Sequence, residues 1–184
     1  MTSANKILPA AVLTAFAVSA VAGCSSSSST TATTTGTETL AGTVLGAAAV
    51  AGNNGPTVPL TLTGPVATTS SFVPPNNNST KAVITFKTPV GNLVVAANAP
   101  DANQNPVPNA TTCYFSQTVH ATYVVQGGTG KFAGATGSGK ATFAFSATAP
   151  KLASGKCDES DNAQPLAKGA VVTFTASGPL TVKP

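Results

Sequence analysis

The chain has 184 residues, of which 42% are hydrophobic and only 8% are charged, and its formal net charge is +4. All nine basic residues are lysines, scattered along the chain, and aromatic residues make up only 5% of it. Proteins that bind nucleic acids cluster Arg and Lys beside stacking aromatic residues, so we expect no nucleic-acid partner. The length suffices for one domain together with targeting and linking segments.

The N-terminus has the organisation of a signal peptide. A single lysine, Lys6, precedes an apolar segment from Ile7 to Ala20. As a helix this segment would be roughly 21 Å long, which is shorter than the hydrocarbon core of a membrane, about 30 Å. The segment therefore fits a cleaved signal peptide and not a permanent transmembrane helix.

Val21-Ala22-Gly23-Cys24 ends this segment and resembles the lipobox of bacterial lipoproteins. The resemblance implies that residues 1–23 are removed and that the sulfur of Cys24 is lipidated. Acyl chains such as palmitate would then anchor the protein at the extracytoplasmic face of the cell membrane, because two or three chains bind stably. The alternative is ordinary secretory cleavage after Ala20-Val21-Ala22, which would leave Cys24 as a free thiol.

Residues 24–38 are rich in Ser and Thr and lack apolar periodicity, which predicts a flexible tether. Residues 39–184 alternate apolar and polar side chains in short runs between Gly, Pro and Asn clusters. This pattern is typical of an all-β domain. We expect about eight strands in an antiparallel up-and-down barrel, because closure removes exposed sheet edges. A β-sandwich is the alternative.

The alternation also places the strands. The longest expected strand has an apolar face formed by Cys113, Phe115, Val119, Ala121, Tyr123 and Val125, and Gly178-Pro179 should break the chain before a short last strand. Two segments, 100–110 and 150–165, are expected to be surface loops. The predicted strands are residues 40–44, 58–62, 81–87, 93–97, 112–126, 140–148, 172–174 and 180–182.

A glycine-rich segment follows the longest predicted strand. Gly134 to Gly139, followed by Lys140, has the spacing of a phosphate-binding loop, but Ala141 stands where Ser or Thr should contact magnesium. A phosphate-binding loop also needs a helix after it, whereas the residues after Lys140 alternate like a strand. We therefore interpret this segment as a turn between two strands, with Phe132 buried in it.

The sequence Gly127-Gly128-Thr129-Gly130-Lys131-Phe132, followed by Gly134-Ala135-Thr136-Gly137, resembles the connection conserved in the allene oxide cyclase and dirigent barrel superfamily. The resemblance is strong over residues 123–145 and rests on pattern elsewhere. It implies an eight-stranded up-and-down barrel with Phe132 as a plug at one end and the glycines as fold determinants. Members of this superfamily steer radical coupling or isomerise an oxylipin epoxide, so it also implies a small apolar or phenolic substrate.

Cys113 and Cys157 are the only cysteines of the predicted domain. In an oxidising compartment we expect a disulfide that joins the longest strand to the loop 150–165, and the alternative is two free thiols. A cysteine nucleophile would need a base, and His120 is the only histidine. Its parity places His120 on the opposite strand face from Cys113, so we interpret it as a surface or lumen-polar residue.

Asp158, Glu159 and Asp161 cluster beside Cys157. Such oxygen ligands could hold Ca²⁺, but no complete calcium-loop pattern is present, so we expect a solvated acidic loop. One histidine and a paired set of cysteines leave too few ligands for zinc. We expect neither a metal nor a cofactor.

The function expected from these features is that of a membrane-anchored extracytoplasmic lipoprotein. Its barrel would be a non-catalytic module that binds an envelope partner or a small apolar ligand. The alternative is an enzyme of the cyclase and dirigent type. A hollow barrel with converging titratable groups would favour the enzyme. A barrel filled by Phe115, Phe143, Phe145 and Tyr123 would favour a structural module.

Overall fold

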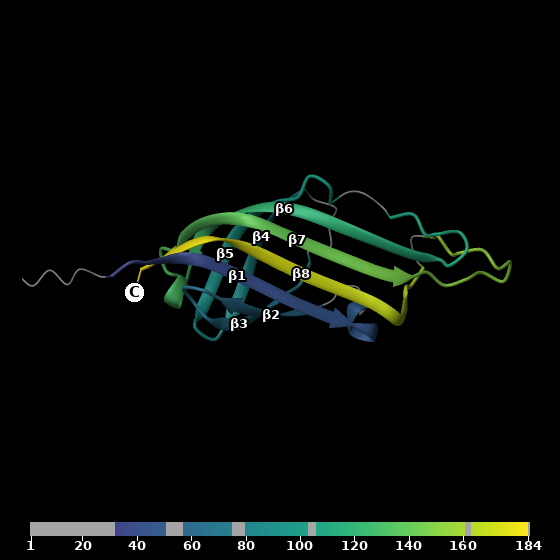
Figure 1. Cartoon of the computed structure of the whole chain (residues 1–184), viewed down its shortest axis with the longest axis horizontal. Helices are drawn as coiled ribbons and strands as arrows, with labels where there is room; N and C mark the ends of the chain where they lie inside the picture. Colours follow the sequence, from purple (N-terminus) through teal and green to yellow (C-terminus); the bar gives the residue numbers. More distant parts are fainter. Residues whose placement is uncertain (1–31, 51–56, 75–79, 103–105, 161–162, 184) are drawn as a thin grey trace, which may run out of the picture. The chain divides into compact units, whose positions relative to one another are not determined.

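A computed structural model describes residues 32–50, 57–74, 80–102, 106–160 and 163–183. Eight antiparallel strands form one curled sheet, with two short 3-10 helices between strands (Figure 1). The predicted signal peptide and Cys24 lie outside the described residues. The elements are β1 (Thr34–Leu45), η1 (Gly46–Val50), β2 (Val58–Thr63), β3 (Thr68–Phe72), β4 (Lys81–Thr88), β5 (Gly91–Asn98), β6 (Tyr114–Gly128), η2 (Gly130–Phe132), β7 (Thr136–Thr148) and β8 (Leu166–Val182).

The strands follow one another around the sheet in chain order. The order β3-β2-β1-β8-β7-β6-β5-β4 places the last strand beside the first, and β1 and β8 pair along the whole of β1. The sheet therefore has the connectivity of an up-and-down barrel with a seam between β3 and β4. The predicted fold class, an eight-stranded antiparallel barrel, is confirmed, and the sandwich alternative fails because the described strands form a single sheet.

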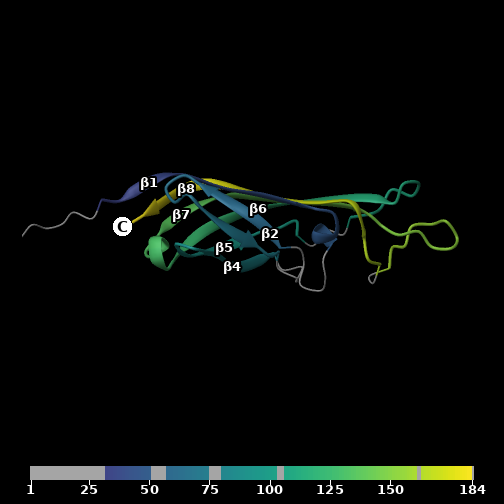
Figure 2. The same ribbon diagram turned by 90° about the horizontal axis from the view of Figure 1, so that it is seen from below.

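The two edges of the sheet approach each other at this seam. The hydroxyl of Ser70 on β3 donates a hydrogen bond to the carbonyl oxygen of Lys87 on β4, at 2.9 Å. The rings of Phe72 and Phe86 lie 6.0 Å apart across the same seam. Phe174 of β8 contacts both rings from the other side of the interior, 4.5 Å from Phe72. Curling thus places β4 opposite β8, as Figure 2 shows, and encloses an apolar interior.

The largest differences from the predicted strands concern β1, β3 and β8, and β7 also begins earlier than predicted, at Thr136. β1 begins at Thr34, inside the segment predicted to be a tether, because Thr34 to Glu38 pair with the end of β8. β3 was not predicted, since Phe72 is its only buried residue. β8 continues through Gly178 and Pro179, where a break was expected, so β8 and not β6 is the longest strand.

Pro179 is accommodated because the ladder between β7 and β8 is interrupted beside it. The pairs run to Lys140–Ser177 and resume at Gly137–Leu180, with no pair formed by Gly178 or Pro179. The proline therefore removes an N–H from a place where β7 does not use one. The prediction missed one strand, β3, and divided another, β8, into two at the expected break. The predicted number of strands is therefore correct although these two strands were not.

The glycine-rich segment connects β6 to β7 through η2, as predicted. Phe132 is fully buried there. The backbone N–H of Lys131 donates to the carbonyl oxygen of Val90, so the connection is fastened to the β4–β5 turn. Gly130 has a φ of 58°, which a side chain would disfavour. The residues after Gly134 enter β7 and not a helix, and Lys140 is exposed, which contradicts a phosphate-binding loop.

Candidate functional site

The curled sheet encloses a cavity of about 250 Å³. Most of its wall is apolar, and seven of the eight strands contribute to it, all except β2. This volume is slightly below the range of roughly 300–1,000 Å³ usual for drug-sized ligands. Side chains that line the cavity include Leu40, Phe72, Ile84, Phe86, Leu93, Val95, Ala97, Val119, Ala121, Val125, Ala141, Phe143, Phe174 and Ala176.

The two ends of the cavity differ. η2, with Phe132, lies where β6 passes to β7 and is hydrogen-bonded to the β4–β5 turn at the same end. At the opposite end Pro74, Thr80 and Ala99, which follow or precede β3, β4 and β5, contribute to the wall. Phe132 is fully buried in this connection, and its role as a plug stays a prediction.

The aromatic residues do not fill the interior together. Phe143 and Tyr123 line the cavity, whereas Phe115 and Phe145 pack on each other, with ring centroids 5.6 Å apart. Phe115 also packs against the disulfide cluster, away from the cavity wall. The interior is therefore partly hollow, and the four rings do not fill it; a filled barrel was the arrangement that would have favoured a structural module.

Glu38 is the one buried charged residue in the part of the chain that the structure describes. Its side chain lines the cavity, and only 2% of its surface is exposed. The backbone N–H of Val66 donates to Oε2 at 3.1 Å, while Oε1 has no hydrogen-bond partner among the described residues. Burial raises the pKa of the Glu38 carboxyl, and the bond from Val66 lowers it in part.

Tyr123 of β6 is the second titratable group in the cavity wall. Burial raises the pKa of its hydroxyl, and the nearby Glu38 carboxyl raises that pKa further. A neutral carboxyl can donate a hydrogen bond as well as accept one, and so can a neutral tyrosine hydroxyl. The cavity thus combines a mostly apolar wall with two titratable groups that can orient a polar atom of a ligand, and Thr80 and Gln117 also line it.

Two glycines make room between these groups. Glu38 pairs with Gly178 on β8, and Tyr123 pairs with Gly139 on β7. The register set by Lys140–Ser177 and Gly137–Leu180 places Gly139 opposite Gly178. A Cβ at Gly139 would lie 2.5 Å from the hydroxyl oxygen of Tyr123, so the tyrosine ring occupies the space that a side chain would fill.

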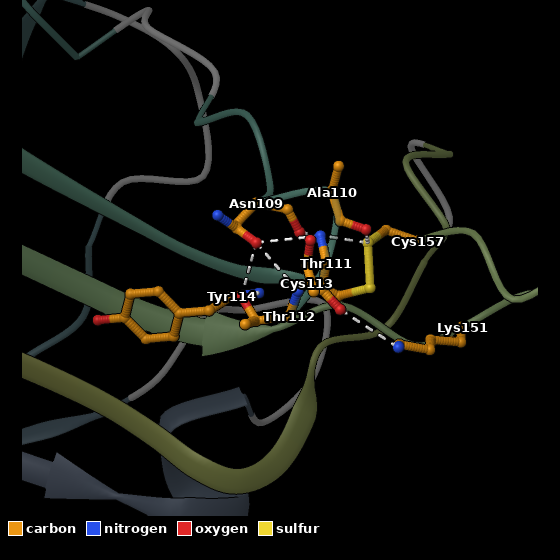
Figure 3. The surroundings of a disulfide bond; sticks show 8 residues. All are labelled: Asn109, Ala110, Thr111, Thr112, Cys113, Tyr114, Lys151 and Cys157. Atoms are coloured by element: carbon orange, nitrogen blue, oxygen red, sulfur yellow. Dashed lines mark hydrogen bonds between the residues drawn. A yellow bond between two sulfur atoms is a disulfide. The ribbon is translucent and has the colours of Figure 1, made fainter.

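The predicted disulfide between Cys113 and Cys157 is present, with its Cα atoms 5.3 Å apart (Figure 3). It joins the residue before β6 to the loop between β7 and β8. Both sides of the bridge are also held by hydrogen bonds. Oδ1 of Asn109 accepts bonds from the backbone N–H groups of Thr111 and Thr112, and Lys151 donates to the carbonyl oxygen of Thr111.

The other predicted candidates do not assemble into a site. His120 is exposed on β6, whereas Cys113 is buried just before that strand, and the backbone N–H of His120 donates to the carboxylate of Asp101. Asp158 accepts hydrogen bonds from Ser160, which lower its pKa, and Asp161 lies outside the described residues. Among the described residues no three His, Cys, Asp or Glu side chains are grouped so that they could hold a metal ion.

A membrane-spanning helix is likewise not found in the described part of the chain. No family model, curated protein or solved structure matches this chain.

Sequence reasoning missed Glu38 because the residue was assigned to the tether. A signal was available, since Glu38 has the same parity as Leu40, Gly42 and Val44, which share one face of a strand over residues 40–44. An acid that continues an inward-facing alternation is a candidate for a buried polar group.

Proposed function

We propose that this protein binds a small apolar ligand inside its β-barrel while a lipid on Cys24 holds it at the extracytoplasmic face of the cell membrane. The observation that carries the binding function is the cavity of about 250 Å³ with a wall that is mostly apolar. A pocket with an apolar wall and a few polar groups is the usual form of a small-molecule site. The anchor rests on the lipobox resemblance of Val21-Ala22-Gly23-Cys24.

One observation supports an enzyme of the cyclase and dirigent type as the second candidate. Glu38 and Tyr123 are two titratable groups in the wall of one apolar cavity, and burial raises the pKa of both. Perturbed groups in a cavity are a mark of acid–base sites. Binding remains the first proposal, because it requires only the cavity, whereas catalysis also requires a reaction for the pair to perform.

Cumene, an aromatic hydrocarbon with no polar atom, is a suitable probe for the binding function. Binding to the folded state alone raises the melting temperature. We expect cumene to raise the melting temperature of the wild-type protein and of Thr122→Phe, whose added ring would lie on the exposed face of β6. Ala121→Phe, one residue away, would place the ring in the cavity and should abolish the shift.

Circular dichroism should first show that Ala121→Phe is folded. A cumene shift that persists unchanged in folded Ala121→Phe would contradict binding in the barrel. So would the absence of any shift in the wild-type protein at cumene saturation.

The anchor is tested independently of the cavity. Replacing Cys24 with Ala should move the protein from the membrane fraction to the aqueous fraction. Intact-mass analysis of the wild-type protein should show an acylated chain that begins at Cys24. An unmodified mature chain that begins at Gly23 would contradict lipidation.

A further inference from the structure

The unpaired oxygen of Glu38 points to the chemical class of the ligand. We propose that the cavity selects an uncharged apolar molecule that carries a hydrogen-bond-accepting oxygen, such as a ketone or an aldehyde, and that the Glu38 carboxyl donates a proton to this oxygen in a hydrogen bond. This inference rests on the proposed binding function and deepens it. Its basis is the difference between the two oxygens of one side chain.

Oε2 of Glu38 already accepts a hydrogen bond from the backbone N–H of Val66. An oxygen that accepts such a bond is the poorer place for a proton, so the proton of the neutral carboxyl belongs on Oε1. Oε1 is buried and has no partner among the described residues. A buried polar atom without a partner is costly, so a ligand oxygen placed there would remove an unfavourable feature of the empty site.

The surroundings of Glu38 disfavour a cationic ligand. The residues of the cavity wall include no lysine, and the wall is mostly apolar, so the charged form of the carboxyl is desolvated without a compensating charge. An amine would require that charged form, whereas a ketone requires the neutral form. The hydrogen bond from Val66 holds the carboxyl in the same position for an amine or a ketone. The site therefore distinguishes the two ligands by their charge and not by the position of the carboxyl.

Tyr123 supplies a second donor. It lies in one row with Glu38, because Gly178 and Gly139 pair with these two residues and lie opposite each other on β8 and β7. Its ring passes over Gly139, beyond which Gly178 lies beside Glu38. Neither glycine adds a side chain between Glu38 and Tyr123 along this row. A single ligand oxygen with two lone pairs could therefore accept from both groups.

Three probes of equal heavy-atom count separate the possibilities: acetophenone, a ketone; cumene, the hydrocarbon of the same branched shape; and 1-phenylethylamine, a cation at neutral pH. Affinities are measured by calorimetry with the wild-type protein, Glu38→Gln and Glu38→Met. Glutamine keeps an acceptor for Val66 and a donor for the ligand, without charge. Methionine keeps the length of the side chain but has neither.

We expect Glu38→Met to weaken acetophenone binding by about tenfold, the usual effect of losing one hydrogen bond, and to leave cumene binding unchanged or tighter. Glu38→Gln should retain the affinity for acetophenone within about threefold, because its amide donates in place of the carboxyl. Tyr123→Phe should weaken acetophenone binding by a smaller factor and should not affect cumene. This pattern requires donation by a neutral group at position 38.

Two outcomes would overturn the inference while the binding function stands. In the first, acetophenone and cumene bind, and Glu38→Met changes neither. In the second, 1-phenylethylamine binds the wild-type protein more tightly than acetophenone does and is lost in Glu38→Gln, which would show that the carboxylate charge is used. If none of the three probes binds the wild-type protein, the proposed binding function itself is wrong.

Discussion

Glu38 and Tyr123 lie in one row across four neighbouring strands, with Gly178 and Gly139 between them. The two glycines add no side chain to the row between a buried carboxyl and a half-buried phenol. Both titratable groups have raised pKa values, and burial is the larger cause for each. The row supplies the titratable groups of a cavity whose wall is mostly apolar.

The raised pKa of Glu38 predicts how stability depends on pH. A carboxyl whose pKa is higher in the folded state binds more protons there, so its contribution to stability is complete below its ordinary pKa of 4.5 and is lost as pH rises through the folded value. The melting temperature of the wild-type protein should therefore fall as the pH rises above 4.5 and through the raised pKa of Glu38. Glu38→Gln should lack this fall.

Glu159→Gln is the matched control for this titration, because it makes the same change at an exposed glutamate. Its melting curve should keep the wild-type dependence on pH. Equal slopes for Glu38→Gln and the wild-type protein above pH 4.5 would show that Glu38 has the same pKa in both states.

Gly139 should not tolerate alanine. Its Cβ would collide with the carbonyl oxygen of Ser177 and would lie 2.5 Å from the hydroxyl oxygen of Tyr123. Overpacking of this kind typically costs about 1–3 kcal/mol, which urea denaturation can measure. Gly36→Ala is the control, since its Cβ would meet only the side chain of Pro65, at 3.1 Å. Equal effects at the two positions would contradict the close packing of Tyr123 on β7.

Phe132 is expected to be a major determinant of stability. It is fully buried in the connection that closes one end of the sheet, and truncation of a buried Phe costs about 3–5 kcal/mol. Phe132→Ala should therefore lower the melting temperature substantially. Lys131→Ala and Lys140→Ala alter exposed residues and should have little effect. Saturable micromolar binding of ATP with Mg²⁺ that is abolished by Lys140→Ala would revive the phosphate-loop interpretation.

The disulfide should stabilise the domain by restricting the unfolded chain. Cys113 and Cys157 are separated by 44 residues, and closing a loop of this size contributes about 4 kcal/mol in the chain-entropy model. Changing both residues to Ser should lower stability by up to this amount. Alkylation of the unreduced protein should label neither cysteine, and reactivity of both thiols in freshly isolated protein would contradict the bridge.

The sequence predicted those features that depend on local alternation. The inward faces of β6 and the turn around Phe132 follow from side-chain parity and glycine spacing. β3 could not be recognised in this way, because its sequence Thr-Thr-Ser-Ser-Phe has one apolar residue. Its strand conformation follows from pairing with β2 and from the contact of Phe72 with Phe174 across the interior. Such contacts between distant segments are not encoded in a local pattern.

The continuity of β8 was also beyond local reasoning. Gly178-Pro179 is ordinarily a signal for a turn, but β1 pairs with both residues on one side. The volume of the cavity depends on how many of the inward-facing side chains are small. Ala97, Ala121 and Ala176 all face it, and their effect is seen only when the strands are assembled.

The central claim is that a small apolar molecule binds inside the barrel, and intermolecular nuclear Overhauser effects test it most directly. In a complex with cumene, we expect cross-peaks from the ligand to the methyl groups of Val95 and Val119, which line the cavity. Val83 and Val124 are exposed valines on β4 and β6 and should show none. Cross-peaks confined to Val83 and Val124, with none to Val95 or Val119, would place the ligand on the outer surface and contradict the claim.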